Sequence, residues 1–322
     1  MRIPQVWAEA QGKRFLLATT SILIGMLVFM QDAGAQTDDA KASFSFGLIA
    51  DCQYCKLAGD GRRKYSMSKE KLESCVEHLN RFELEFVVHL GDFIDRDFGS
   101  FKVVGPIFDG LKAPGYHVLG NHDFAVSDQQ KALVPAKLGL ENRYYAFQAE
   151  GWRFLVLDGN DISFIAWPKG SAEYQAATDY YSKLKTESPK WNGAVGKEQL
   201  AWLTDNLDEA KKANEKVMVF CHFPVFPANS HNLWNADEVM QLLEQYDEVK
   251  AYVNGHNHAG NYGEKNGIHY LTLKAMVDTE ENAYAVMQVF DDRLEMSGFG
   301  REKDRSLKLR IGAAISSSSP AQ

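Results

Sequence analysis

Polar side chains follow five separate apolar runs of the sequence, and this pattern constrains the fold most. Gly120-Asn121-His122-Asp123 comes directly after the apolar run 116–119. Four other apolar runs, at 44–50, 86–90, 216–220 and 249–253, end in Asp51-Cys52-Gln53, Gly91-Asp92-Phe93-Ile94-Asp95, Cys221-His222-Phe223-Pro224 and Gly255-His256-Asn257-His258. Short apolar runs bounded by turn residues are typical of buried strands. Carboxylate, amide and imidazole groups at five strand ends are what a two-metal site on an α/β scaffold requires.

The roles within such a site follow from ligand chemistry. Two divalent ions about 3.5–4 Å apart share a bridging ligand, and Asp92 is the best candidate for it. We expect Asp51, Gln53 and His258 to bind the first ion with Asp92, and Asn121, His222 and His256 to bind the second. Gly91, Gly120 and Gly255 precede ligands at points where we expect tight backbone turns. Oxygen and imidazole ligands without thiolate suit Mn, Fe, Zn or Co, and Mg is also possible.

His122 lies beside a predicted ligand and is a candidate catalytic residue rather than a ligand. We expect it to stabilise or protonate a departing oxygen, with Asp123 orienting its ring. Each of these residues alone could be an ordinary polar residue at the end of a strand. The agreement of all five segments is what indicates a metal site.

Residues 1–35 have the pattern of a secretory signal peptide. Lys13 and Arg14 precede an apolar run of 16 residues from Phe15 to Met30, and Ala33-Gly34-Ala35 provides small residues for cleavage after Ala35. We therefore expect an exported protein, periplasmic or secreted, without stable membrane association after cleavage. The alternative is an uncleaved membrane anchor, although the run is short for a span of the bilayer.

The rest of the chain has the composition of one globular domain. Of 322 residues, 45% are hydrophobic and 24% are charged. No repeat or linker interrupts residues 41–311, so we expect a single domain there, followed by a flexible tail at 312–322. The net charge of −8 and the lack of a basic run exclude a general attraction for nucleic acid. An anionic substrate would need local positive charge, for which bound metal ions are the obvious source.

The four cysteines are Cys52, Cys55, Cys75 and Cys221. Cys52-Gln53-Tyr54-Cys55 has the spacing of a redox C-x-x-C motif, but predicted metal ligands lie within and beside it. Disulfides persist in export compartments. We therefore expect either buried thiols or a structural disulfide in which Cys52 pairs with Cys55 or Cys221.

Periodicity predicts the elements between the strand ends. Helical spacing occurs at 67–82, 101–112 and 127–137, from Gly196 onward, and at 235–246. Residues 143–148 and 152–157 read as a hairpin, which favours a mixed sheet, and 269–276, 283–290 and 293–298 alternate like further hairpins. His89 is expected to be a hydrogen-bonded core residue. The polar but aromatic-containing segment 160–195 could be a substrate-covering lid or a small satellite core.

The five segments together resemble the calcineurin-like metallophosphoesterase superfamily. Its pattern is D-x-H, G-D-x-x-D/E, G-N-H-D/E, a lone His and G-H-x-H, and each element is present in order over roughly residues 46–258. Gln53 stands where most members have His. That departure resembles the manganese-dependent ADP-ribose/CDP-alcohol diphosphatase branch. The likeness to this branch extends to Asn192-Gly193, Glu198–Leu203, Trp234-Asn235 and Gly267–Leu273.

The resemblance implies a fold and an activity. The fold would be a four-layer α/β/β/α sandwich of two mixed β-sheets with a dinuclear site, with manganese as the expected metal. The reaction would be hydrolysis of the phosphoanhydride bond of nucleoside diphosphate conjugates such as ADP-ribose or CDP-alcohols, by attack of a metal-bound hydroxide. Two alternatives stay open: a broader phosphodiesterase or phosphomonoesterase, and a catalytically silent metal-binding protein.

Overall fold

The structure, a computed structural model, describes residues 41–59, 61–184 and 188–310. The predicted signal peptide over residues 1–35 and the predicted tail over 312–322 lie outside the described residues. In the described part of the chain, no helix is both long enough and apolar enough to cross a membrane.

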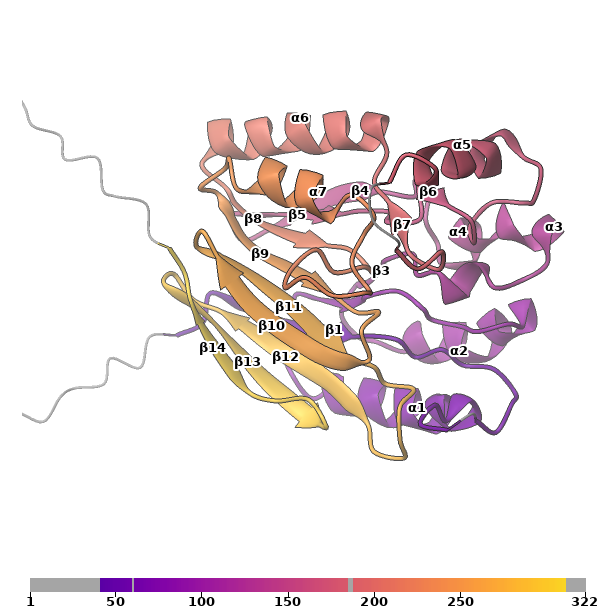
Figure 1. Ribbon diagram of the computed structural model, residues 1–322. Helices are drawn as coiled ribbons and strands as arrows, with labels where there is room; N and C mark the ends of the chain where they lie inside the picture. The colour runs from indigo at the N-terminus through magenta and orange to yellow at the C-terminus, as the bar shows by residue number, and fades with distance from the viewer. Residues whose placement is uncertain (1–40, 60, 185–187, 311–322) are drawn as a thin grey trace, which may run out of the picture. The chain divides into compact units, whose positions relative to one another are not determined.

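Two six-stranded sheets form the centre of the fold (Figure 1). The first has the order β14-β13-β12-β1-β2-β3, and its strands are β1 (Phe44–Ile49), β2 (Phe86–His89), β3 (Gly115–His117), β12 (Ala283–Val289), β13 (Arg293–Gly300) and β14 (Arg305–Lys308). Strands β1, β2 and β3 run parallel, whereas β12 to β14 are antiparallel to their neighbours. The sheet is therefore mixed, and the carboxyl ends of its three parallel strands lie at one edge.

The second sheet is also mixed, with its parallel strands in the centre. Its order is β10-β11-β9-β8-β5-β4, and its strands are β4 (Tyr145–Ala149), β5 (Trp152–Val156), β8 (Lys216–Phe220), β9 (Val249–Asn254), β10 (Ala259–Lys265) and β11 (Ile268–Lys274). Strands β5, β8, β9 and β11 are parallel, and β4 and β10 close the two edges as antiparallel strands. The predicted hairpin of β4 and β5 is confirmed, and Glu150 and Gly151 at its turn both have positive φ.

Alternate residues of each central strand point into the space between the sheets. In β1 these are Phe44, Phe46 and Leu48, and they meet Phe154 of β5 and Phe220 of β8. The Phe46 and Phe154 rings lie 6.0 Å apart, and the Phe154 and Phe220 rings 5.8 Å apart, measured between centroids. Removing a buried phenylalanine of this kind costs about 3–5 kcal/mol. The interdigitated aromatic layer therefore fixes one sheet against the other.

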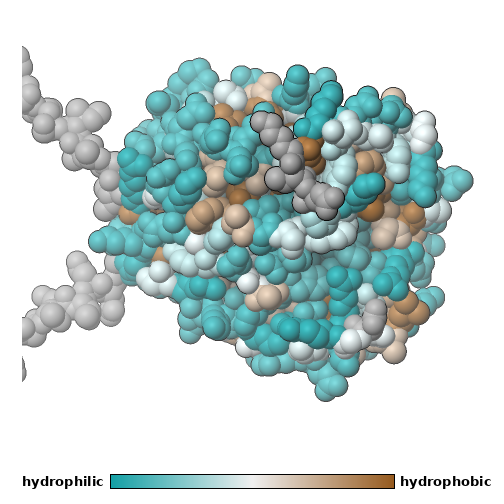
Figure 2. All heavy atoms as spheres, viewed as in Figure 1, coloured by the Kyte–Doolittle hydropathy of each residue, from teal (hydrophilic) through white to brown (hydrophobic). Residues whose placement is uncertain are grey.

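Helices cover the two outer faces. On the first sheet, α1 (Ser68–Leu79) and α2 (Phe101–Phe108) bury apolar residues against the other face of β1 and β2. On the second sheet, α6 (Lys197–Ala213) and α7 (Ala236–Leu243) do the same against β5, β8 and β9. The predicted four-layer α/β/β/α arrangement is confirmed. Because the helices bury their apolar residues against the sheets, the outer surface is left mainly polar. The face shown in Figure 2 is mainly hydrophilic with scattered hydrophobic residues.

Two predictions of local structure were wrong. The helix predicted over 127–137 is two short helices, α3 (Asp128–Lys131) and α4 (Val134–Lys137), because Pro135 has no N–H to continue the first one. The strands predicted over 269–276, 283–290 and 293–298 were expected to form successive hairpins, but of these β11 and β12 do not pair, whereas β12 and β13 do. Strand β11 belongs to the second sheet, so the segment 275–282 crosses from one sheet to the other.

The segment over 160–195 forms the small satellite core that was one of its two predicted roles. It contains β6 (Ile162–Ser163), α5 (Ala172–Tyr181) and β7 (Gly193–Ala194). The rings of Tyr174, Tyr181 and Trp234 surround Phe164 at centroid distances of 5.4, 5.4 and 5.5 Å and form a small aromatic core. Residues outside this core, Ile165 and Trp191, line the cavity described below.

All four cysteines are free and buried, so the alternative of buried thiols is confirmed and the alternative of a disulfide is wrong. Burial raises the pKa of Cys52 to about 12 and that of Cys221 to about 11, so both thiols stay protonated at neutral pH. His89 is buried as expected. Neither of its ring nitrogens, however, has a hydrogen-bond partner among the described residues, which contradicts the predicted hydrogen bonding.

Candidate metal centre

All seven predicted ligands come from the carboxyl ends of parallel strands or the loops that follow them. Both sheets contribute, and the ligands follow in the order Asp51 and Gln53 after β1, Asp92 after β2, Asn121 after β3, His222 after β8, and His256 and His258 after β9. Six of the seven are buried, and the His258 side chain is 17% exposed. The structure therefore brings together every residue that the sequence predicted as a ligand.

Asp92, Asn121, His222 and His256 form one group. His222 Nε2 lies 3.2 Å from Asp92 Oδ2, 3.2 Å from Asn121 Oδ1 and 3.1 Å from His256 Nδ1. One ligand atom from each of Asp92, His222 and His256 falls within a common distance of 4.8 Å. Ligand atoms that converge from three strands at this spacing are suited to hold one divalent ion.

Asp51, Gln53, His258 and again Asp92 form the second group. Gln53 Nε2 lies 2.9 Å from Asp92 Oδ2 and 3.0 Å from His258 Nε2, and His258 Nε2 lies 3.6 Å from Asp51 Oδ1. Asp92 Oδ2 is common to both groups, as expected for a shared carboxylate. The backbone explains the pairing, because Gln53 N donates to Asp92 O at 2.8 Å and so continues the alignment of β1 with β2.

The side chain of Gln53 provides a test of whether these residues fit a metal ion. Its Oε1 atom is buried and has no hydrogen-bond partner among the described residues. The two ends of an amide are assigned from their surroundings, and a half-turn exchanges them. That exchange would place the oxygen between Asp92 Oδ2 and His258 Nε2, where a cation would satisfy all three acceptors. The residues therefore fit a divalent cation.

The charges in the site are consistent with this fit. Burial alone would raise the pKa of Asp92, but His222 and His122 outweigh it and hold this pKa well below its usual range. Burial would lower the pKa of His222, but Asp92 and Asp51 raise it to about 9. A positive charge beside Asp92 is therefore favoured in this buried group, as a divalent cation would provide.

Strained backbone holds several ligands in place. Asp51, Gln53, Asp92 and His256 have φ values of 52, 46, 57 and 68°, in the left-handed region that non-glycine residues rarely adopt. Such conformations persist only where the surrounding structure enforces them, and they concentrate at functional sites. Of the three glycines expected at tight turns, only Gly91 has a positive φ, of 93°. Gly120 and Gly255 instead allow close approach, because a Cβ on either would collide with Asp92 or Asp51.

The predicted partner of His122 was wrong. Its Nδ1 lies 2.9 Å from Oδ1 of Asp95, which is buried, so Asp95 orients the ring. Asp123 instead accepts hydrogen bonds from four backbone N–H groups, those of Asp92, Phe93, Ile94 and Gly120. Asp123 therefore ties the loop after β2 to the loop after β3. Asp95 ends the G-D-x-x-D segment, and that motif was the signal that could have identified it.

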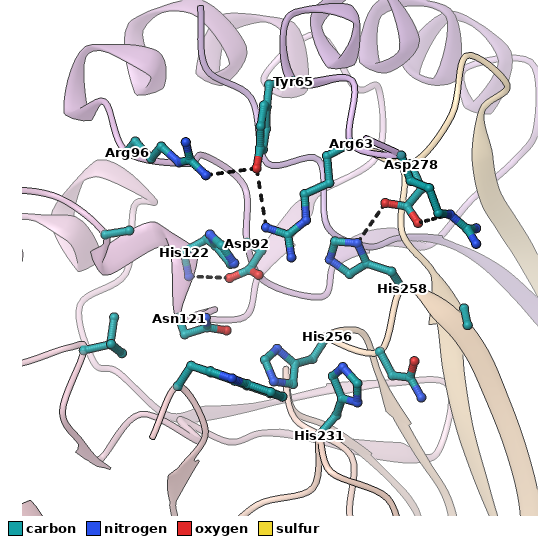
Figure 3. Close-up of a pocket in the computed structure, with 16 residues that line it drawn as sticks. Arg63, Tyr65, Asp92, Arg96, Asn121, His122, His231, His256, His258 and Asp278 are labelled. Carbon is teal, nitrogen blue, oxygen red and sulfur yellow. Dashed lines mark hydrogen bonds and ion pairs between the residues drawn. The ribbon is translucent and has the colours of Figure 1, made fainter. Parts of the chain in front are cut away.

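A cavity of about 810 Å³ opens onto the ligands (Figure 3). Asp92, Asn121, His122, His256 and His258 form its floor. Its walls carry three arginines, two aromatic side chains and one further histidine: Arg62, Arg63, Arg96, Tyr65, Trp191 and His231. From the sequence, bound metal ions were predicted to supply the local positive charge for an anionic substrate. The structure adds arginines from two loops as a second source of that charge.

This architecture, two packed mixed sheets with metal ligands at the ends of their parallel strands and a cationic cavity above them, is that of a metal-dependent phosphohydrolase. Residues 44–260 match the family model of the calcineurin-like phosphoesterases, and the chain belongs to that family.

Known proteins of similar sequence and structure agree with this assignment. The manganese-dependent ADP-ribose/CDP-alcohol diphosphatase of Arabidopsis thaliana is 33% identical over 80% of this chain and 94% of its own length. The protein of the same name from Oryza sativa subsp. japonica is 30% identical over 82% of this chain and 94% of its own length. A dimetal phosphatase from Danio rerio superposes with a TM-score of 0.74 at 26% identity, over 84% of this chain and all of that one. The predicted resemblance to this branch is confirmed.

Proposed function

We propose that the protein is a manganese-dependent diphosphatase that hydrolyses the phosphoanhydride bond of nucleoside diphosphate conjugates such as ADP-ribose and CDP-alcohols. The names of the relatives suggest the substrates. The observation that carries the proposal is the cavity, whose floor holds the metal ligands and whose walls hold arginines.

The distribution of the arginines suits a substrate with two adjacent phosphates. Arg62 pairs with Asp278, and Arg96 pairs with Asp95. Arg63 forms no ion pair with a described carboxylate, and its Nη1 lies 3.5 Å from the Tyr65 hydroxyl. Arg63 is therefore available to a second phosphate, while ions held by the metal ligands would bind the first. A volume of about 810 Å³ also suits a ligand of nucleotide-conjugate size, since small-molecule sites span about 300–1,000 Å³.

Two divalent ions are the proposed cofactor, one for each group of ligands, with Asp92 shared. Gln53 favours manganese, because a neutral amide oxygen is a harder and weaker ligand than imidazole. When bound, such ions neutralise negative charge on the phosphate and lower the pKa of a bound water molecule.

The chain's own residues supply the remaining functions. His122 faces the cavity with its Nδ1 held by Asp95, so that Nε2 is free to donate a proton to the departing oxygen. Asp92 and Asp95 raise the pKa of His122 against the effect of burial, which favours the protonated form needed for this role. Asp123 keeps the two loops that carry Asp92 and His122 in register.

A substrate panel tests the proposal. Purified protein would be assayed with ADP-ribose, CDP-choline, cyclic nucleotides and p-nitrophenyl phosphate, each with Mn, Mg or Zn, and Asp92→Ala would serve as the inactive control. We expect the highest kcat/KM for the two diphosphate conjugates with Mn. Preferred hydrolysis of cyclic nucleotides or p-nitrophenyl phosphate would instead support one of the broader phosphoesterase activities. No turnover of any substrate would support the silent metal-binding protein.

Export is a separate proposal that rests on the sequence of residues 1–35. The basic, apolar and small-residue segments support cleavage after Ala35 and release into the periplasm or the medium. Mass spectrometry of the protein from fractionated cells would be expected to give a mature N-terminus at Gln36. An intact N-terminus in the membrane fraction would show an uncleaved anchor instead.

A further inference from the structure

The buried carboxylate of Asp278 contacts the histidine ligand that is partly exposed. Asp278 Oδ1 lies 2.9 Å from His258 Nδ1, on the opposite side of the ring from the metal ligands (Figure 3). The other ring nitrogen, Nε2, faces Gln53 and Asp51. An acceptor at Nδ1 places the proton there and leaves the Nε2 lone pair directed toward a metal ion.

Each of the three predicted histidine ligands has one ring nitrogen that points away from the other ligands. The three histidines differ in the hydrogen-bond partner of that nitrogen. His222 Nδ1 lies 2.8 Å from the backbone oxygen of Leu90, and His256 Nε2 lies 2.9 Å from Oδ1 of Asn192. Both partners are neutral. Asp278 is the one carboxylate among the three, and a carboxylate makes an imidazole ligand more basic as well as orienting it.

The segment that carries Asp278 is fixed to both loops of the same ligand group. Val277 N donates to Asp51 O at 2.9 Å, and Ala275 N donates to His258 O at 3.2 Å. The ammonium group of Lys71 in α1 also donates to the carbonyl oxygens of Met276 and Thr279 in this segment. The position of Asp278 relative to Asp51 and His258 is therefore set by backbone contacts and does not depend on its own side chain.

The second oxygen of Asp278 lies 3.3 Å from Arg62 Nε. The Arg62 side chain is 69% exposed, so this ion pair contributes little to stability by itself. Both oxygens of Asp278 therefore have partners of their own, His258 Nδ1 and Arg62 Nε. Asp278 is thus a neighbour of the ligands and not a ligand.

We propose that Asp278 is a positioning residue for His258, which fixes the orientation and tautomer of this ring and so sets the affinity of the metal position formed by Asp51, Gln53, His258 and Asp92. The proposal rests on the metal site of the proposed function and is independent of the substrate.

Manganese binding to Asp278→Ala, Asp278→Asn and wild-type protein tests it, measured by calorimetric titration of the metal-free protein. Changes in such partners of metal ligands cost about 10–100-fold in metal affinity. We expect Asp278→Ala to weaken one of two manganese sites by that factor. Asp278→Asn keeps an acceptor oxygen without the charge, so we expect a smaller loss. The matched control is Glu280→Gln, which removes an exposed carboxylate two residues further along the same segment and should bind manganese as wild type does.

The melting temperature of each metal-free variant separates positioning from folding. Positioning requires weaker manganese binding at an unchanged metal-free melting temperature. If Asp278→Ala lowers that temperature, the decision rests on Asp278→Asn, and wild-type manganese affinity in that variant overturns the proposal. Wild-type affinity in a stable Asp278→Ala overturns it too. Wild-type protein that binds no manganese would refute the metal site itself, and a protein that binds manganese but hydrolyses no diphosphate would refute only the proposed substrate.

Discussion

Gly120→Ala is a steric test of the site, because it adds one methyl group and changes no ligand. An ideal Cβ at this position would lie 2.1 Å from the backbone nitrogen of Asp92 and 2.2 Å from its Oδ1. Comfortable contacts between such heavy atoms begin near 3.5 Å, so Asp92 or the loop after β3 must move by roughly 1 Å or more. The displaced group would be the carboxylate that both ligand groups share.

A displacement of about 1 Å at a catalytic group can cost about 100-fold in rate. We therefore expect kcat/KM of Gly120→Ala to fall at least about 100-fold, equivalent to about 2.7 kcal/mol of transition-state stabilisation. Overpacking should also lower the free energy of unfolding by about 1–3 kcal/mol. Steady-state kinetics with manganese and the best substrate of the panel, together with thermal melting, measure both effects.

The matched control is Gly105→Ala. A Cβ at Gly105 meets no atom within 4 Å other than those of its chain neighbours, and the residue lies inside α2, away from the ligands. Gly105 precedes Pro106, whose ring crowds a Cβ on the residue before it, so the variant is expected to melt at a somewhat lower temperature. It should nevertheless keep full activity. A folded Gly120→Ala protein with kcat/KM within about threefold of wild type would show that catalysis does not require the present position of Asp92, and would refute this reasoning.

Three further substitutions test individual roles. Asp92→Ala should abolish turnover and lower the manganese content, since one carboxylate serves both ligand groups; two ions per chain in this variant would remove that role from Asp92. His122→Ala should lower turnover by about 10²–10⁴ while the manganese content stays unchanged, whereas an empty site would make His122 a ligand. Gln53→His should shift the metal preference from manganese toward zinc. Turnover and metal content of the variant and the wild type, each measured with Mn, Zn and Mg, would test this. Identical metal profiles for the two proteins would show that position 53 does not set the metal preference.

The strands and ligands could be predicted because their signals are local. A continuous apolar run that ends in Asp, Asn or His is visible within ten residues of sequence, as at Phe86–Asp92 or Val249–His256. Parallel strands then bring their carboxyl ends to one edge whatever the loop lengths between them. The same reasoning predicted the hairpin of β4 and β5, where Glu150-Gly151 marks the turn.

Partners that depend on tertiary position could not be predicted in this way. Asp123 is adjacent to His122 in sequence, yet its carboxylate turns toward backbone N–H groups and Asp95 takes the ring. Asp278 lies 20 residues beyond His258, in the segment that crosses between the sheets. Alternation could identify β11 and β12 as strands but not assign them to different sheets, because both faces of both strands are largely buried.

The predicted ligands are divided between the sheets: Asp51, Gln53, Asp92 and Asn121 follow strands of the first, and His222, His256 and His258 follow strands of the second. A metal ion bound to both sets would act as a cross-link between the sheets. This cross-link would lie at the carboxyl ends of the parallel strands, outside the aromatic layer that packs between the sheets. Any sliding of one sheet against the other would break that cross-link before it disrupted either sheet. Metal occupancy would therefore report on the alignment of the two halves, and binding to the folded state alone would add stability that grows with metal concentration.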